Sequence, residues 1–234
     1  MAMRRAHVMS FRGTGSVGPV RAGLLLAALV LAGAPARRTE AADQAGKVVD
    51  ASGAPLAGAV VFVEQLPPGA PTPAATARTA AMDQVQKQFV PRILPVVAGT
   101  AVTFPNHDQI HHHVYSFSRT KTFELPLYKG EAAPPVVFDQ TGAASIGCNI
   151  HDWMEAVIVV VPTPYYAVTG DDGLFVLRDL PAGPIELAAW HERQRATARQ
   201  QVTAGDGAAP ITMSVDVAPP RARAAPRGAA RGYE

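Results

Sequence analysis

The feature that most constrains the fold is an unbroken β-branched run from Val157 to Val161. β-Branched side chains favour strands over helices, and a continuous apolar strand must be covered on both faces. Such a strand suits the interior of a sandwich of sheets. Gly and Pro are also abundant, with 20 and 21 residues respectively. We therefore predict an all-β chain that is rich in turns.

Short apolar runs bounded by turn residues predict the other strands. The runs lie at 46–50, 59–63, 89–91, 93–97, 100–104, 114–117, 136–138, 144–147, 174–177, 185–190 and 211–217. Residues 66–81 are rich in Pro, Ala and Thr, and we expect them to form a surface connection. Residues 192–200 are interpreted as a turn and the start of a strand.

Residues 1–42 predict a secretory signal peptide. Arginines precede an apolar run at 22–34, and small residues at 34–36 and 39–41 fit a cleavage site. The run is short for a membrane span, although an uncleaved anchor is the alternative. We expect a periplasmic or otherwise exported protein with no stable membrane span after cleavage.

The basic residues are concentrated at the two ends of the chain. Residues 43–217 hold 11 Lys and Arg against 17 Asp and Glu, which gives a net charge of −6. The tail at 218–234 is rich in Pro, Arg and Ala and is expected to be disordered. The sequence therefore does not predict nucleic-acid binding.

The single cysteine of the chain lies in the motif Cys148-x2-His151-x2-Met154. A lone cysteine cannot form an internal disulfide. Thiolate, imidazole and thioether donors together match a trigonal copper site with a weak axial ligand. A second imidazole must come from elsewhere, and residues 106–113 contain four histidines, at 107, 111, 112 and 113.

Other kinds of site also use some of these residue types. Structural zinc sites prefer more cysteines and rarely use Met. A catalytic cysteine needs a base and an orienting partner that no pattern here provides. A buried cysteine beside an incidental Met is the plainest alternative. We expect His107 to be a surface residue, and Trp190 with His191 to be a packed pair at a strand end rather than a metal or sugar contact.

The central part of the chain resembles the cupredoxins, and its ligand loop has amicyanin-like spacing. The resemblance covers residues 82–161 and implies a Greek-key β-sandwich of the amicyanin and plastocyanin kind. It also implies one type 1 (blue) copper site. The position after the first His ligand is commonly Asn in that family but is His113 here, so His111 and His113 are rival candidates for the ligand. The motifs that carry it are Val96-x2-Gly99-Thr100-x-Val102-x-Phe104-x-Asn106 and Cys148-x2-His151-x2-Met154, and the implied ligands are His112, Cys148, His151 and Met154.

The flanking segments carry a second resemblance, to carboxypeptidase regulatory-like domains. These have a transthyretin-like or carbohydrate-binding-like sandwich. The resemblance implies that 43–66 and 164–217 form one small sandwich into which the cupredoxin domain at 82–161 is inserted. The motifs are Gly46-x-Val48-x-Asp50-x2-Gly53-x-Pro55-Leu56-x-Gly58-Ala59 and Asp171-x-Gly173-x-Phe175-x-Leu177-x2-Leu180-Pro181-x-Gly183.

The whole chain also resembles proteins labelled methylamine utilization protein, through the strings around His112 and Cys148. These resemblances imply a non-enzymatic electron carrier whose partner is a redox protein, for example a c-type cytochrome or a dehydrogenase. A copper storage or delivery protein, and a carbohydrate- or partner-binding module with structural copper, are the alternatives. We expect Trp153 to form an apolar collar around His151 where the partner docks, the alternative being burial between the sandwiches.

Overall fold

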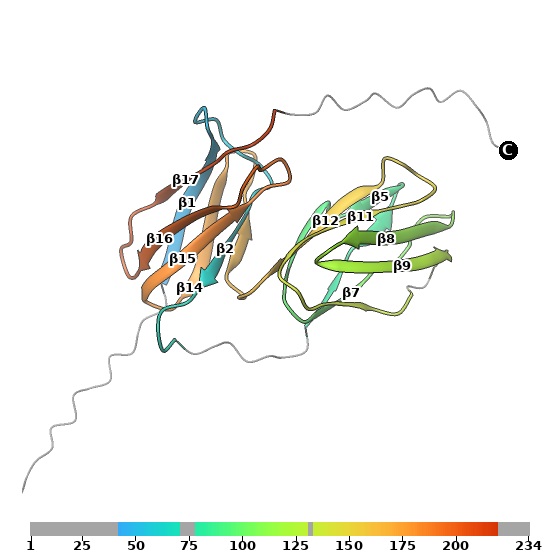
Figure 1. Cartoon of the computed structure of the whole chain (residues 1–234), viewed down its shortest axis with the longest axis horizontal. Coiled ribbons are helices and arrows are strands. Elements are labelled where there is room, and N and C mark those ends of the chain that lie inside the picture. Colours follow the sequence, from blue (N-terminus) through green and yellow to red (C-terminus); the bar gives the residue numbers. More distant parts are fainter. Residues whose placement is uncertain (1–41, 71–77, 131–132, 220–234) are drawn as a thin grey trace, which may run out of the picture. The chain divides into compact units, whose positions relative to one another are not determined.

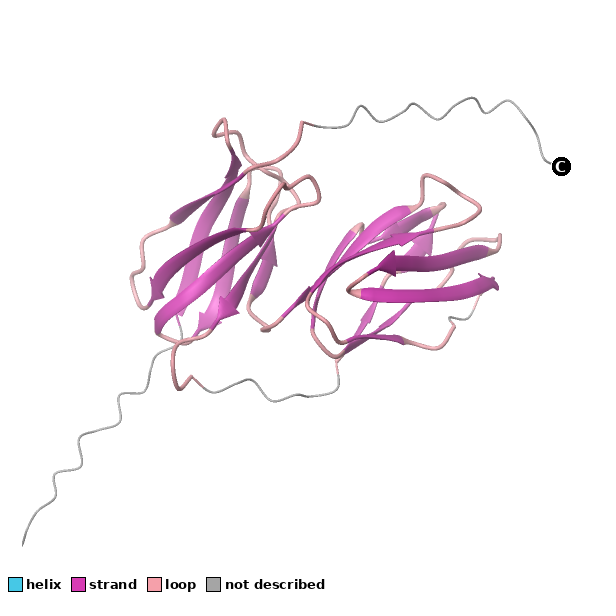
Figure 2. Cartoon of the chain, in the orientation of Figure 1, coloured by secondary structure: helices cyan, strands magenta, loops and turns pink. Residues whose placement is uncertain are grey.

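The computed structural model describes residues 42–70, 78–130 and 133–219. These residues form strands, turns and loops, with no helix among them (Figures 1 and 2). The described ranges consequently hold no helix that could cross a membrane. The predicted all-β, sandwich-type fold class is confirmed, whereas the expected signal peptide and most of the expected tail lie outside the described residues.

The first and last described strands make up two sheets. Strand β1 (Ala42–Asp50) lies between β14 (Leu174–Leu180), to which it is antiparallel, and β17 (Ile211–Val215), to which it is parallel. The second sheet has the order β13-β2-β15-β16. Its strands are β13 (Tyr166–Val168), β2 (Val60–Gln65), β15 (Gly183–Trp190) and β16 (Ala198–Ala204).

These two sheets enclose a common apolar core. Val48, Leu177, Leu187 and Met213, each 2% exposed or less, belong to it. Two short early strands cannot form a stable unit alone. Their pairing with strands more than a hundred residues later supplies the missing partners.

The intervening strands make up a second pair of sheets and a hairpin. The larger sheet has the order β6-β12-β11-β8-β9, and the smaller one β10-β7-β3. The hairpin is formed by β4 and β5. The bounds are β3 (Thr79–Ala81), β4 (Asp83–Val85), β5 (Gln88–Val90), β6 (Ile93–Val97), β7 (Thr100–Thr103), β8 (His112–Ser118), β9 (Lys121–Tyr128), β10 (Val136–Phe138), β11 (Gly142–Gly147) and β12 (Glu155–Val161).

The unbroken apolar runs of β2 and β12 bury both of their faces. In β12, Ile158 and Val160 enter the core that also holds Cys148. Val159 and Val161 point the other way, into a separate buried cluster that also contains Val60 and Phe62 of β2. Successive side chains of a strand alternate between faces. The continuous run therefore follows from contact on both sides of the strand.

Strands β3, β4, β9 and β13 were not among the predicted strands, and two of them are instructive. Strand β9 follows β8 through a tight turn and forms one edge of the larger sheet, where Pro126 is tolerated. Phe123, Leu125 and Leu127 alternate along it, but the sequence analysis did not predict this strand. Strand β3 lies within the segment at 66–81, which was expected to be only a surface connection, and it pairs in parallel with β7. That part of the prediction is wrong because long-range pairing with β7 orders a segment rich in Pro, Ala and Thr that has no strand pattern of its own.

Candidate metal centre

The Cys-His-Met loop connects two neighbouring strands at one end of the larger sheet. Cys148 directly follows β11, and Met154 directly precedes β12. Register places Gly147 opposite Glu155 on one side and opposite Tyr115 of β8 on the other. The start of β8, where His112 lies, is therefore at the same end of the sheet. Antiparallel pairing thus brings residues far apart in the sequence to one place.

Three of the predicted ligands lie together. The donor atoms of His112, Cys148 and His151 are all within 4.8 Å of one another. The Cys148 Sγ is 3.8 Å from the His151 Nδ1. His112 and Cys148 are 0% and 3% exposed, whereas His151 is partly exposed. One thiol and two imidazoles therefore converge on a small volume at the edge of the core.

The two ring nitrogens of His112 have different surroundings. Its Nε2 lies 2.7 Å from the Asp108 Oδ2, while its Nδ1 is buried and has no hydrogen-bond partner among the described residues. A buried polar atom without a partner is costly. A metal ion beside Cys148 and His151 would give that nitrogen a partner, so the residues present fit a soft, imidazole-binding metal such as copper.

The ring of His151 is suited to ligation as a neutral base. Burial lowers its pKa below the usual value, and the charges of His112 and Lys87 lower it further. Its ring lies edge-on to His112, with centroids 5.0 Å apart, and 5.2 Å from the ring of Trp153. Because metals bind the neutral imidazole, this environment favours the binding form.

The fourth predicted ligand, Met154, closes the loop. Its backbone N–H donates to the carbonyl of His151, at 3.0 Å. Its side chain is 1% exposed and belongs to the same apolar core as Cys148. The loop therefore returns directly into the sheet after His151, and the Met154 thioether is buried in the same core as the Cys148 thiol.

The neighbouring histidines are not part of this cluster. His111 is exposed, and His113 pairs its Nε2 with the Glu124 Oε1 at 2.8 Å. His107 is exposed and lies 3.6 Å from Asp83. His191 is buried at the end of β15, where its Nδ1 accepts the Arg193 N–H. Successive residues of a strand face opposite sides, which separates His112 from His113.

The residue that the sequence analysis missed is Asp108. Burial raises the pKa of its carboxyl, but hydrogen bonds from the Lys87 N–H, the His112 ring and the Gln86 N–H outweigh burial and leave the pKa below its usual value. Asn106 braces the same loop by accepting the Asp108 N–H at 2.9 Å. The Asp-x3-His spacing was visible in the sequence, but only the fold shows that the two side chains meet.

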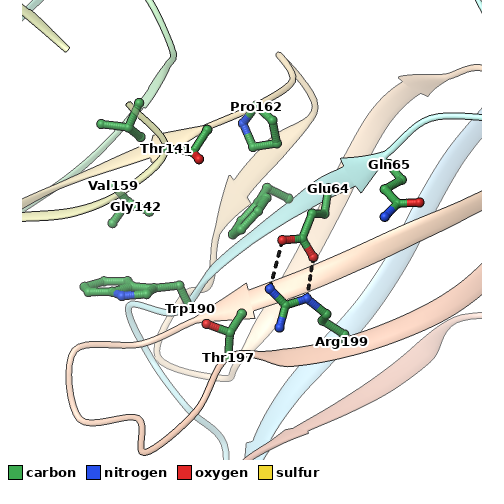
Figure 3. Close-up of a pocket in the computed structure, with 11 residues that line it drawn as sticks. Glu64, Gln65, Thr141, Gly142, Val159, Pro162, Trp190, Thr197 and Arg199 are labelled. Carbon is green, nitrogen blue, oxygen red and sulfur yellow. Dashed lines mark hydrogen bonds and ion pairs between the residues drawn. The ribbon is translucent and has the colours of Figure 1, made fainter. Parts of the chain in front are cut away.

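A separate pocket has a volume of about 430 Å³. Figure 3 shows the residues that line it. Trp190 and Thr197 line it, together with Arg199, which donates two hydrogen bonds to Glu64, at 2.5 and 2.9 Å. None of the residues that line it belongs to the His112–Cys148–His151 cluster. The pocket is therefore distinct from the candidate metal centre.

Comparison with protein-family models and with curated proteins finds no match. Among solved structures, the chain is similar to a purple cupredoxin from Nitrosopumilus maritimus, with 23% identity and a TM-score of 0.31 over 35% of this chain and 98% of that chain. It is similar to a reduced amicyanin variant, with 22% identity and a TM-score of 0.33 over 44% of this chain and 98% of that one.

A copper-containing nitrite reductase from Thermus scotoductus is a further neighbour, with 25% identity and a TM-score of 0.33 over 39% of this chain and 24% of that chain. All three neighbours match at low identity over less than half of this chain. At such TM-scores they carry no functional inference, so the function proposed below depends on the geometry of the cluster.

Proposed function

We propose that the protein binds one copper ion in a type 1 site and carries single electrons. The observation that supports this most strongly is buried His112, whose ring offers a donor within 4.8 Å of a thiol and a second imidazole and whose Nδ1 has no hydrogen-bond partner. A thiolate and two imidazoles, with Met154 as a weak axial donor, are the ligand set of such sites. Bound copper would supply a one-electron change between its two oxidation states.

The residues of the chain would hold these donors still. His112 begins β8 inside a hydrogen-bonded sheet, and Cys148 and Met154 are buried in one core. Closely packed interiors resist displacement of their side chains. A donor set that keeps its positions in both oxidation states needs little reorganisation when the metal gains or loses an electron. Electron transfer requires such a rigid site, whereas metal storage does not.

We further propose that the partner docks over His151. This ring is partly exposed, and beside it Trp153 and Ile150 are 63% and 49% exposed. The alternative expectation, that Trp153 is buried between the sandwiches, is wrong. Weak redox encounters use small surfaces, and exposed apolar residues around a ligand edge fit a redox protein such as a c-type cytochrome or a dehydrogenase. We propose no enzymatic activity for this site.

The remaining assignments are also proposals. The pairing of β1 and β2 only with β13–β17 supports a small carboxypeptidase regulatory-like sandwich, 43–66 plus 164–217, into which a cupredoxin domain at 82–161 is inserted. The parallel pairing of β3 with β7 supports extending this proposed inserted domain back to residue 79. The arginine-flanked apolar run at 22–34 supports export.

The test is the visible spectrum of the copper-loaded protein. Wild type should show an intense thiolate-to-copper band and a reversible redox wave, and Cys148→Ser should lose both. His112→Ala should lose or strongly alter the band, whereas the matched control His111→Ala should keep it. A band that survives Cys148→Ser contradicts the proposal. Tight, colourless copper binding without a wave would instead favour copper storage or delivery.

A further inference from the structure

A carboxylate lies directly behind the most buried ligand of the proposed site. The Asp108 Oδ2 is 2.7 Å from the His112 Nε2, and the two side chains are 14% and 0% exposed. This is the ring nitrogen opposite the unpartnered Nδ1, so the imidazole spans the distance from the carboxylate to the cluster. Among the described residues, this carboxylate alone forms an ion pair with a member of the cluster.

The backbone fixes this carboxylate from its other side. The Gln86 N–H donates to Oδ1 at 2.6 Å, and the Lys87 N–H donates to Oδ2 at 2.8 Å. These two residues form the turn between β4 and β5, and their φ angles of 52° and 58° are in the left-handed region. Non-glycine residues adopt that region only at an energetic cost. The turn thus directs two backbone N–H groups at the Asp108 carboxylate, and these hydrogen bonds fix the orientation of the carboxylate.

We propose that Asp108 is a positioning residue that lowers the reduction potential of the bound metal and raises the affinity for divalent ions, an inference that rests on the proposed copper function. By accepting the Nε2–H it fixes the tautomer that leaves Nδ1 free, and it makes the ring a stronger donor. Its fixed, largely buried negative charge stabilises the more positive, oxidised ion more than the reduced ion.

The alternative is that Asp108 only braces the loop between Asn106 and His112. A brace would affect folding stability without changing the relative stability of two oxidation states. The reduction potential separates the two roles because it compares two states of the same folded protein. A matched control is Asp152, an exposed carboxylate next to His151 in the chain that makes no hydrogen bond to a proposed ligand among the described residues.

The experiment measures the reduction potentials of copper-loaded wild type, Asp108→Asn and Asp152→Asn. We expect Asp108→Asn to keep the thiolate band and to raise the potential. The expected rise corresponds to at least a tenfold lower ratio of Cu(II) to Cu(I) affinity, which equals about 59 mV for one electron. Asp152→Asn should shift it by clearly less. Equal shifts in the two variants, or no shift in Asp108→Asn, overturn the inference.

Two further measurements keep the inference separate from the proposed function. If wild type gives no reversible redox wave, the proposed electron-transfer function fails, but zinc titration against a chelator still tests the role of Asp108. Asp108→Asn should bind Zn²⁺ at least about tenfold more weakly than wild type. An unchanged affinity for Zn²⁺ overturns the inference. If the variant does not fold, NMR of zinc-loaded wild type should show a slowly exchanging His112 Nε2–H. Its absence overturns the inference.

Discussion

At the scale of single residues, the candidate centre depends on side chains and on one missing side chain. Gly147 immediately precedes Cys148, and a Cβ built there would lie 2.9 Å from the ring of Tyr115 on the neighbouring strand. The Tyr115 ring in turn lies tilted against the rings of His113 and Phe117, at centroid distances of 5.7 and 5.0 Å. The strand that delivers the thiol can therefore approach β8 only because position 147 carries no side chain.

Gly147→Ala should consequently destabilise the protein. The added methyl must displace an aromatic ring held by its neighbours, and overpacking of this kind costs about 1–3 kcal/mol of unfolding free energy. The measurement is urea unfolding of the metal-free protein. The matched control is Gly205→Ala, because nothing lies within 4 Å of a Cβ at that position. Equal stability of the two variants would show that the Tyr115 ring moves aside freely.

At the scale of elements, the hairpin β4–β5 is small but supports the centre. Its two-residue turn, Gln86-Lys87, has positive φ at both positions, as a type I′ turn requires. Asn-Gly is the sequence that such turns prefer, and Gln-Lys is not. The turn is retained although its residues disfavour it, which agrees with its two N–H donors being needed at Asp108.

Lys87→Gly should raise the unfolding free energy. Glycine adopts a φ of 58° without steric cost, so the substitution relieves the strain of the turn. This gain outweighs the greater conformational freedom of glycine in the unfolded chain, and the unfolding free energy should rise by about 1 kcal/mol. Differential scanning calorimetry of the metal-free protein measures the change. Arg119→Gly, in the turn after β8 and without a positive φ, should lose stability instead. A loss in Lys87→Gly as well would mean that the turn is not strained.

At the scale of the whole molecule, two apolar cores are joined by a third buried cluster, and stability depends on all of them. His191 lies where β15 leaves this region and is 4% exposed. Burial lowers its pKa, and the charge of Arg193 lowers it further. Smaller effects come from the Glu192 carboxylate and the Ala57 carbonyl, which raise the pKa, and from Arg92, which lowers it.

The stability of the metal-free protein should therefore fall in mild acid. A histidine whose folded pKa lies below its usual 6.5 binds protons more readily when unfolded. Its contribution to stability is complete above that value and is lost as the pH falls toward the folded pKa. Urea unfolding between about pH 5 and pH 8 measures the slope. His191→Gln should make it shallower and the exposed control His111→Gln should not; an unchanged slope in His191→Gln would contradict the assignment.

The sequence by itself determined the fold class and most of the donor set. The run from Val157 to Val161 predicted a strand buried on both faces, and the structure has that strand as β12. Cys148, His151 and Met154 lie within seven consecutive residues, so a single short loop must bring them close together. Local patterns of this kind need no knowledge of distant partners, because alternation and spacing act over a few residues.

The tertiary structure decided what depends on distant segments. Four histidines lie between 106 and 113, and only the direction of β8 brings His112, rather than His111 or His113, to the cysteine. The carboxylate of Asp108 and the turn at Gln86-Lys87 gain their role from contacts across some twenty residues, as their separations of 22 and 21 show. Strand direction and long-range pairing arise from packing of the whole chain, which no local pattern encodes.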